Sequence, residues 1–139
     1  MFDKEAATAL LNSAFAPWVR DLDLTIESIS ADALILRMKF SERLCRDNGV
    51  ICGQSLMALA DTAGPLAISA AAGRYVAMTT VDQTSHFLKP AANADVLAEA
   101  QVRRLGRTMA FCSVTMRTAD DPRPVALAQI AYALLREPD

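Results

Sequence analysis

The chain has 139 residues, of which 53% are hydrophobic and 22% charged, and its formal net charge is −2 at pH 7. This length suits a single domain over residues 1–139, and charges of mixed sign scattered along the chain provide no basic surface for nucleic acid. The charged N-terminus lacks the apolar core of a signal peptide and the longest uncharged apolar stretch, 62–73, is too short to cross a bilayer, so we expect a cytoplasmic protein that does not bind membranes.

The first half of the chain shows both helical and strand patterns. Residues 1–20 are predicted to form an N-terminal helical segment, in which apolar residues recur with the helical period from Lys4 to Arg20 and Pro17 interrupts the helix. Alternating apolar and polar residues predict strands over 22–26 and 34–40, and the polar stretch 41–50 is typical of a loop. A long apolar helix is predicted over 53–72, ending near Gly73.

The second half is rich in β-forming residues separated by short polar links. It predicts four strands, over 76–88, 96–105, 108–118 and 124–136. One very apolar helix before a run of strands favours an α+β fold, in which a curved antiparallel sheet wraps around the long central helix. This order of elements is similar to that of the hotdog fold.

Asp61 is the only charged residue on the predicted central helix. The positions three and four residues away hold Met57, Ala58, Gly64 and Pro65, so Asp61 is not part of a polar stripe facing solvent. A buried carboxylate is costly unless it is paired, hydrogen-bonded or protonated. We interpret Asp61 as a functional carboxylate, and a solvated Asp on an amphipathic helix is the alternative.

Three segments resemble thioesterases of the phenylacetate-degradation type, which have the hotdog fold. Residues 49–54, Gly-Val-Ile-Cys-Gly-Gln, followed by Asp61, resemble the family motif G-x-x-H-G-G followed seven residues later by Asp. Residues 80–90 resemble the third strand of that family, and residues 104–108 resemble its hairpin on the coenzyme A side. The resemblance implies an acyl-CoA thioesterase that needs no cofactor, with coenzyme A as part of the substrate. It also implies a homo-oligomer, either a dimer or a dimer of dimers.

The chain departs from the family motif at three positions. The family His falls on Cys52, its second Gly falls on Gln54, and its upstream Asn falls on Arg46, whereas Gly53 and Asp61 are kept. We assign the three replaced positions to substrate binding. A Cys52 thiol at a helix N-terminus can be a nucleophile, and a thiol that only packs is the alternative.

Thioester hydrolysis needs a base or nucleophile and a donor for the developing oxyanion. Asp61 supplies the first, and the Gly53 amide at the positive end of the helix is a natural second, although Gly53 can also simply open the helix. They lie about 12 Å apart along a helix axis, whereas both have to be within about 3 Å of one carbonyl. We therefore predict a composite site, with Gly53 from one subunit and Asp61 from another. The resemblance gives Thr80 the role of a hydroxyl that positions the attacking water.

The remaining site predictions concern substrate binding. Arg104 and Arg107 flank the Gly106 turn, where they can reach coenzyme A phosphates or remain solvated. His86, the only imidazole, is expected at the surface or in a substrate channel. A single His argues against a metal site, and three cysteines without CxxC spacing indicate reduced thiols.

Two other enzyme classes fit the same residues less well. A hotdog hydratase needs an Asp and a His close together, and an α/β-hydrolase needs G-x-S-x-G, which residues 53–57 do not complete. A non-catalytic acyl-CoA-binding module remains open, because Cys52 and Gln54 are compatible with lost chemistry.

Overall fold

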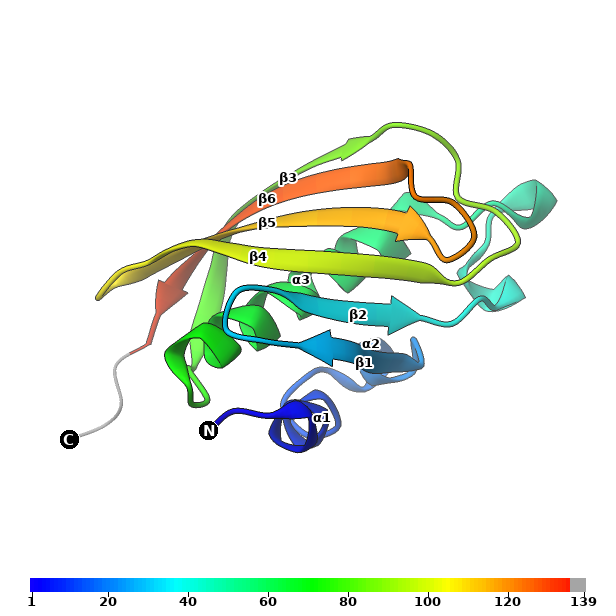
Figure 1. Ribbon diagram of the computed structural model, residues 1–139. Coiled ribbons are helices and arrows are strands. Elements are labelled where there is room, and N and C mark those ends of the chain that lie inside the picture. The colour runs from blue at the N-terminus through cyan, green and yellow to red at the C-terminus, as the bar shows by residue number, and fades with distance from the viewer. Residues whose placement is uncertain (136–139) are drawn as a thin grey trace.

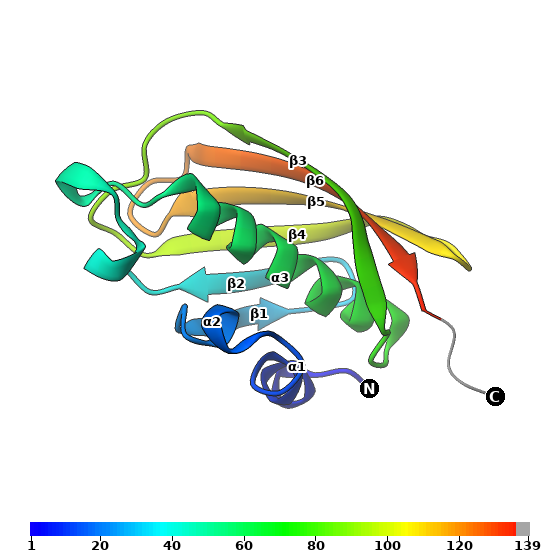
Figure 2. The same ribbon diagram turned by 180° about the vertical axis from the view of Figure 1, so that it is seen from behind.

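A long helix, α3 (Gly53–Ala72), lies across the concave face of a six-stranded antiparallel sheet in the computed structural model, which describes residues 1–135 (Figure 1, Figure 2). The strands are β1 (Leu24–Ile29), β2 (Leu34–Met38), β3 (Met78–Phe87), β4 (Val96–Leu105), β5 (Met109–Thr118) and β6 (Pro124–Leu134). They are ordered β1-β2-β4-β5-β6-β3, so β1 and β3 form the edges. The α+β hotdog fold predicted from the order of elements is confirmed.

The N-terminal segment contains two short helices rather than one. Helix α1 covers Lys4–Leu11 and α2 covers Pro17–Arg20. Pro17 is at the start of α2, where the missing N–H has no intrahelical partner to lose, so the proline begins a second helix. In Figure 2, α1 lies below the β1 edge of the sheet, whereas α2 lies in front of β1, on the same side of the sheet as α3.

Element boundaries differ from the predicted ones by a few residues. β1 begins at Leu24 instead of Leu22, after a turn in which Asp23 has a positive φ of 58°. The predicted loop 41–50 contains two 3-10 turns, η1 (Glu42–Leu44) and η2 (Asp47–Gly49). The last predicted strand, 124–136, ends at Leu134, and Arg136 lies outside the described residues.

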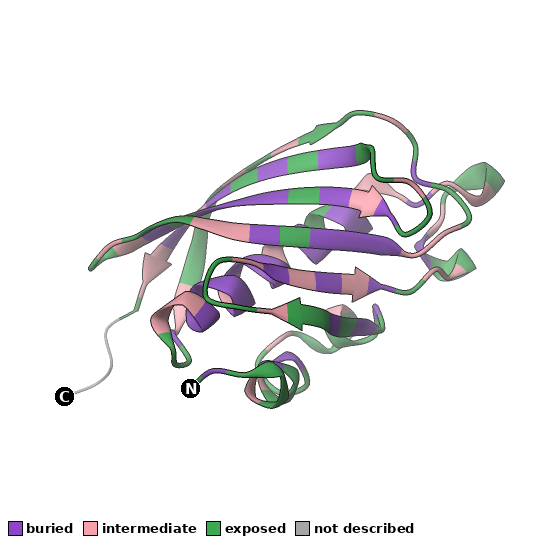
Figure 3. Ribbon diagram, in the orientation of Figure 1, coloured by how far each residue is buried: buried purple, intermediate pink, exposed green. Residues whose placement is uncertain are grey.

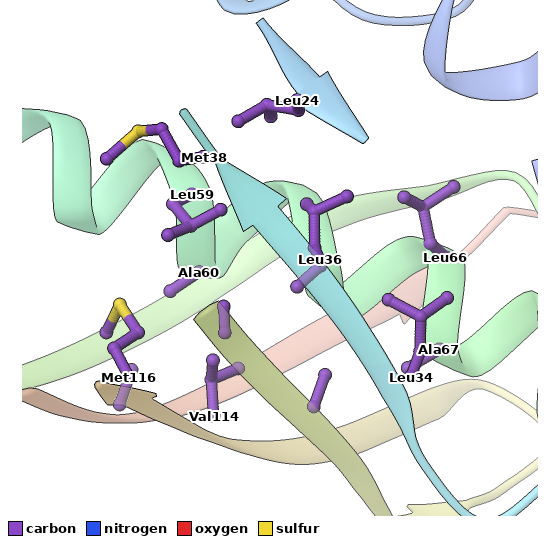
Figure 4. Packing of buried hydrophobic residues seen from close by; sticks show 14 of the residues in the cluster. Leu24, Leu34, Leu36, Met38, Leu59, Ala60, Leu66, Ala67, Val114 and Met116 are labelled. Atoms are coloured by element: carbon purple, nitrogen blue, oxygen red, sulfur yellow. The ribbon is translucent and has the colours of Figure 1, made fainter. Parts of the chain in front are cut away.

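The core lies between α3 and the inner face of the sheet. Alternate residues of β2 and β5 are buried, as the banding in Figure 3 shows. In Figure 4, α3 side chains pack against those of β2 and β5: Leu59, Ala60, Leu66 and Ala67 face Leu34, Leu36, Met38, Val114 and Met116. Each fully buried aliphatic side chain stabilises the fold by about 1.5–3 kcal/mol. Helix α3 is long and apolar enough to cross a membrane, but 67% of its most apolar window is buried in this core.

The β3 edge differs from the other strands because it is largely exposed. Val81 and Phe87 on this strand, and Leu88 just after it, are at least half exposed. The strand pairs with β6 on one side only. An exposed edge with unpaired backbone groups is a surface on which another strand can pair.

Candidate active site

Asp61 lies in the middle of α3, with its side chain facing β3 and β6. Its Oδ1 accepts a hydrogen bond of 2.8 Å from the Thr80 hydroxyl and one of 3.0 Å from the Tyr132 hydroxyl. Within residues 1–135, no group donates a hydrogen bond to Oδ2. Two neutral donors therefore hold one carboxylate oxygen, and the other receives no hydrogen bond from the described residues.

Gly64 and Pro65 shape the helix beside Asp61. Proline at position 65 has no N–H to donate to the carbonyl four residues earlier, which is that of Asp61. An added Cβ on Gly64 would lie 2.1 Å from the Tyr132 hydroxyl. The glycine thus provides the space that lets the tyrosine reach Asp61 beneath the helix.

A β-bulge brings the Thr80 side chain to Asp61. In the β3–β6 ladder, Thr80 pairs with Tyr132 and Asp82 pairs with Ala131, so Val81 is an extra residue without a partner. Residues directly opposite each other in an antiparallel ladder share a face, and Tyr132 is fully buried on the inner face. If the register of residues 82–87 continued without the bulge, Val81 would lie opposite Tyr132, so the bulge is the reason that a hydroxyl faces Asp61.

Two buried titratable groups lie beneath the carboxylate. Burial raises the pKa of the Tyr132 phenol far above its ordinary value, and the nearby Asp61 charge adds to this effect. Burial, followed by the same charge, raises the pKa of the Cys112 thiol to about 12. Both groups are neutral near pH 7, so Asp61 faces hydrogen-bond donors there rather than cations.

An open hollow of about 530 Å³, lined in part by α2 residues, leads to Asp61. Its walls are largely apolar and come from the N-terminal segment, α3 and β3. The apolar wall residues include Phe15, Trp18, Val19, Met57, Pro65 and Met78. Among the lining residues Asp61 is the only charged one, and Gln54 and Gln83 add polar groups. The hollow suits an uncharged, apolar group held next to a carboxylate.

Gly53 is the first residue of α3, eight residues before Asp61. An added Cβ on Gly53 would be 3.3 Å from the Phe87 ring, at the far end of β3 from Thr80. Between the two points, the Gln83 side-chain amide donates to the Met57 carbonyl at 3.2 Å. The helix and β3 therefore run side by side, and about 12 Å of helix separates Gly53 from Asp61. One chain does not bring both groups to a single carbonyl.

The structure gathers only some of the predicted site residues. Thr80 and Gln54 line the hollow with Asp61. The Cys52 sulfur lies 3.5 Å from the Ser55 hydroxyl in the first turn of α3. Arg46 forms an exposed ion pair of 2.8 Å with its neighbour Asp47, and His86 is exposed near the Gly53 end of β3.

Gly106 and Arg107 line a second hollow of about 660 Å³ at the β4–β5 hairpin. The Leu134 amide donates to the Thr108 carbonyl at 2.8 Å, and Leu134 pairs with Met78 on β3. The hairpin, with the exposed Arg104 and Arg107, therefore lies at the Asp61 end of β3 and not at the Gly53 end. Substrate-binding roles for these residues remain predictions. The described part of the chain has no group of three or more His, Cys, Asp or Glu suited to a metal ion.

Several residues of the site were not anticipated from the sequence. In the sequence, Tyr132 stands at one of the alternating apolar positions of a strand, and its hydrogen-bond partner, Asp61, is 71 residues away. Phe15 and Trp18 form a wall only because the N-terminal segment folds back beside α3. Gly64 did carry a signal, since a glycine inside a helix costs about 1 kcal/mol relative to alanine and indicates a packing requirement.

Comparisons with known proteins agree with this architecture. The family model of the Thioesterase superfamily matches residues 48–125, which include Asp61 and Thr80. A candidate esterase of Halobacterium salinarum is 30% identical over 152 residues, covering 98% of this chain and 97% of its own. A solved candidate thioesterase from Silicibacter sp. TM1040 is 26% identical with a TM-score of 0.87, and covers 98% of this chain and 94% of its own.

The zebra fish thioesterase superfamily member 2 is similar in fold, with a TM-score of 0.85 at 21% identity, over 97% of this chain and all 100% of its own. The family match covers more than half of the chain, and the Halobacterium relative covers nearly all of it. These similarities support a hydrolase that acts on thioesters. The chain belongs to the thioesterase superfamily.

Proposed function

We propose that this protein is an acyl-CoA thioesterase that hydrolyses a coenzyme A thioester to the free acid and coenzyme A. The observation that carries the proposal is the Asp61 carboxylate, held on one oxygen by Thr80 and Tyr132, at an apolar hollow. An enzyme of this type needs a base or nucleophile next to a pocket for the acyl group, and a carboxylate can fill either role.

Asp61 Oδ2 is the reactive oxygen in this proposal. As a base, it takes a proton from water while the water oxygen attacks the thioester carbonyl carbon; the carbon–sulfur bond then breaks and the thiolate takes up a proton. The Thr80 proton is directed at Asp61, so the Thr80 oxygen is free to accept a hydrogen bond from that water. As a nucleophile, Oδ2 attacks the carbonyl carbon, the carbon–sulfur bond breaks, and the coenzyme A thiolate leaves and takes up a proton. Water then hydrolyses the mixed anhydride to the free acid and regenerates the Asp61 carboxylate.

The oxyanion donor is expected from a second subunit. In the described chain, no group accepts a hydrogen bond from the Gly53 N–H, which lies at the start of α3. If two β3 edges pair antiparallel about a two-fold axis near Gln83, the Phe87 end of one strand meets the Thr80 end of the other. This arrangement places the partner's Gly53 near Asp61 and supports a homodimer, or a dimer of dimers, as the active form.

The acyl group is expected to be apolar and uncharged. The hollow beside Asp61 has apolar and aromatic walls and no cationic lining residue. A carboxylate on the acyl chain would be desolvated next to Asp61 without a partner, which is unfavourable. The exposed Arg104 and Arg107 at the neighbouring hairpin are suited to the phosphates of coenzyme A.

The proposal is tested by turnover of a panel of short, medium and aromatic acyl-CoAs, in which a thiol reagent detects released coenzyme A. Asp61→Asn and Asp61→Ala are expected to lower kcat by a hundredfold or more, on the order of the loss of a general base, with the oligomer still folded. Near-wild-type turnover by Asp61→Ala on the best substrate would contradict it. Tight binding of the panel by the wild type without turnover would instead show an acyl-CoA-binding module.

The composite site is tested with hybrids of two inactive chains. An Asp61→Ala chain and a Gly53→Pro chain, co-expressed with different tags, are expected to regain activity when they assemble together. In such a hybrid, some sites receive an intact group from each subunit. Purified hybrids no more active than their parents, or a fully active monomer, would contradict a shared site.

A further inference from the structure

Tyr132 is the most deeply buried polar side chain around Asp61. It is fully buried on β6, and its hydroxyl is 3.0 Å from Asp61 Oδ1. The register of the ladder places it directly opposite Thr80, and Gly64 leaves the space above its hydroxyl. A phenylalanine would fill the same core volume, so packing does not explain the hydroxyl.

The Tyr132 hydroxyl has only one proton, and it donates that proton in the hydrogen bond to Asp61 Oδ1. The pKa of Tyr132 is raised by burial and then by the Asp61 charge, so the phenol stays a neutral donor. Cys112 on β5, the other titratable group facing this point, is also neutral because burial raises its pKa to about 12. Asp61 is itself the only charged residue on α3, and the group that contacts it from β3 is the neutral Thr80 hydroxyl.

Both donors bind the same oxygen of the carboxylate. The χ2 torsion of an aspartate is broad and roughly two-fold, so a carboxylate held by a single contact can exchange its oxygens easily. Thr80 approaches Oδ1 from an exposed edge strand, whereas Tyr132 approaches it from the rigid core. The core contact is therefore the one that distinguishes the two oxygens.

We propose that Tyr132 is a positioning residue, which clamps Asp61 Oδ1 so that Oδ2 is presented to the substrate hollow. This inference rests on the proposed function, in which Asp61 is the base or nucleophile. Tyr132 does not reach the substrate; it acts through Asp61. Gly64 makes this contact possible, because only a residue without a side chain leaves room for the Tyr132 hydroxyl.

The test compares Tyr132→Phe with the wild type in kcat and KM. The variant is expected to lose about 10- to 100-fold in kcat, in the range of a lost hydrogen bond to a charged group and a misplaced catalytic group. KM should change less than about twofold, because substrate does not contact Tyr132.

Ser69→Ala is the matched control. Ser69 is another fully buried hydroxyl on α3, and it accepts a hydrogen bond of 3.1 Å from the Val76 amide, away from Asp61. It should lower thermal stability without changing kcat or KM. A Tyr132→Phe variant that is folded, less stable and unchanged in kcat would overturn the proposal by showing a structural role only.

A second readout keeps this inference separate from the proposed function. A high-resolution crystal structure of Tyr132→Phe shows how the Asp61 carboxylate is held whether or not any acyl-CoA is hydrolysed. A carboxylate that has rotated, or that occupies two orientations, supports the clamp even if the wild type is inactive, and one that keeps Oδ1 on Thr80 with Oδ2 facing the hollow overturns it. If Tyr132→Phe does not fold, Gly64→Ala displaces the hydroxyl from the opposite side and is expected to give the same loss of kcat and the same movement of the carboxylate.

Discussion

Replacement of Gly64 by alanine should destabilise this protein, although the same change inside most helices is stabilising. The added Cβ would lie 2.1 Å from the Tyr132 hydroxyl, 2.7 Å from Cζ and 2.9 Å from Cε2. These atoms cannot move away easily, because the ring is fully buried and its hydroxyl is bound to Asp61. The substitution therefore forces the ring out of its place in the core.

The expected magnitude combines three effects. Overpacking a core costs about 1–3 kcal/mol, and loss of the hydroxyl–carboxylate hydrogen bond costs about 1.5–3 kcal/mol. The better helix propensity of alanine returns about 1 kcal/mol. We expect the free energy of unfolding to fall by about 1.5–5 kcal/mol, and Tm to fall on the order of 10 °C for a domain of this size.

Thermal and urea unfolding followed by far-UV circular dichroism measure this loss. The Gly64→Ala and Tyr132→Phe double variant is the internal control, because the closest atom in the clash is absent from phenylalanine. Its loss of stability should be smaller than the sum of the two single losses by about 1 kcal/mol or more. A Gly64→Ala protein as stable as the wild type, or strict additivity in the cycle, would refute the reasoning.

Three further outcomes are expected. Cys52→Ala should lower kcat by less than about tenfold, and Cys52→His should be tolerated. An acyl adduct on Cys52, together with complete loss of activity in Cys52→Ala, would instead indicate a thiol mechanism. Trp18→Ala should raise KM for the larger apolar acyl groups more than for the smallest, because Trp18 lines the hollow; a uniform effect on all acyl-CoAs would contradict this. The Phe40 amide, followed by the Arg37 guanidinium, lowers the pKa of Asp95 in the folded protein. The ionised carboxylate therefore stabilises the fold at pH values above its pKa in the unfolded chain, about 3.9, and this stabilisation is lost as the pH falls through the lower pKa of the folded protein. The stability difference between wild type and Asp95→Asn in urea should therefore be constant near neutral pH and shrink below about pH 4; an equal difference at about pH 3 would contradict it.

The fold was accessible from the sequence because its main signals are local. Strand alternation and one long apolar helix are patterns within a few residues of each other, and they lead to the sheet and helix observed. Asp61 was also accessible, because a lone charge in an apolar helix is visible without knowing the partner strands. Thr80 came from resemblance alone.

The rest of the site depends on contacts between distant segments. Tyr132 meets Asp61 only after β6 has paired with β3, and a strand pattern does not state its register. Phe15 and Trp18 reach the hollow only because the chain between α1 and α2 turns back toward α3. The break in the N-terminal helix shows the same limit: Pro17 was visible, but its place at the start of a second helix was not.

The extra residue in β3 has a consequence for how relatives are compared. A copy of this strand without Val81 would keep Thr80 opposite Tyr132, because the ladder would then be regular at that point. A copy of equal length without the bulge would instead turn the side chain at position 81 toward the acid. The residue equivalent to Thr80 is therefore identified across relatives as the one opposite Tyr132 on β6. Counting residues along β3 assigns it wrongly whenever one residue is gained or lost in that strand.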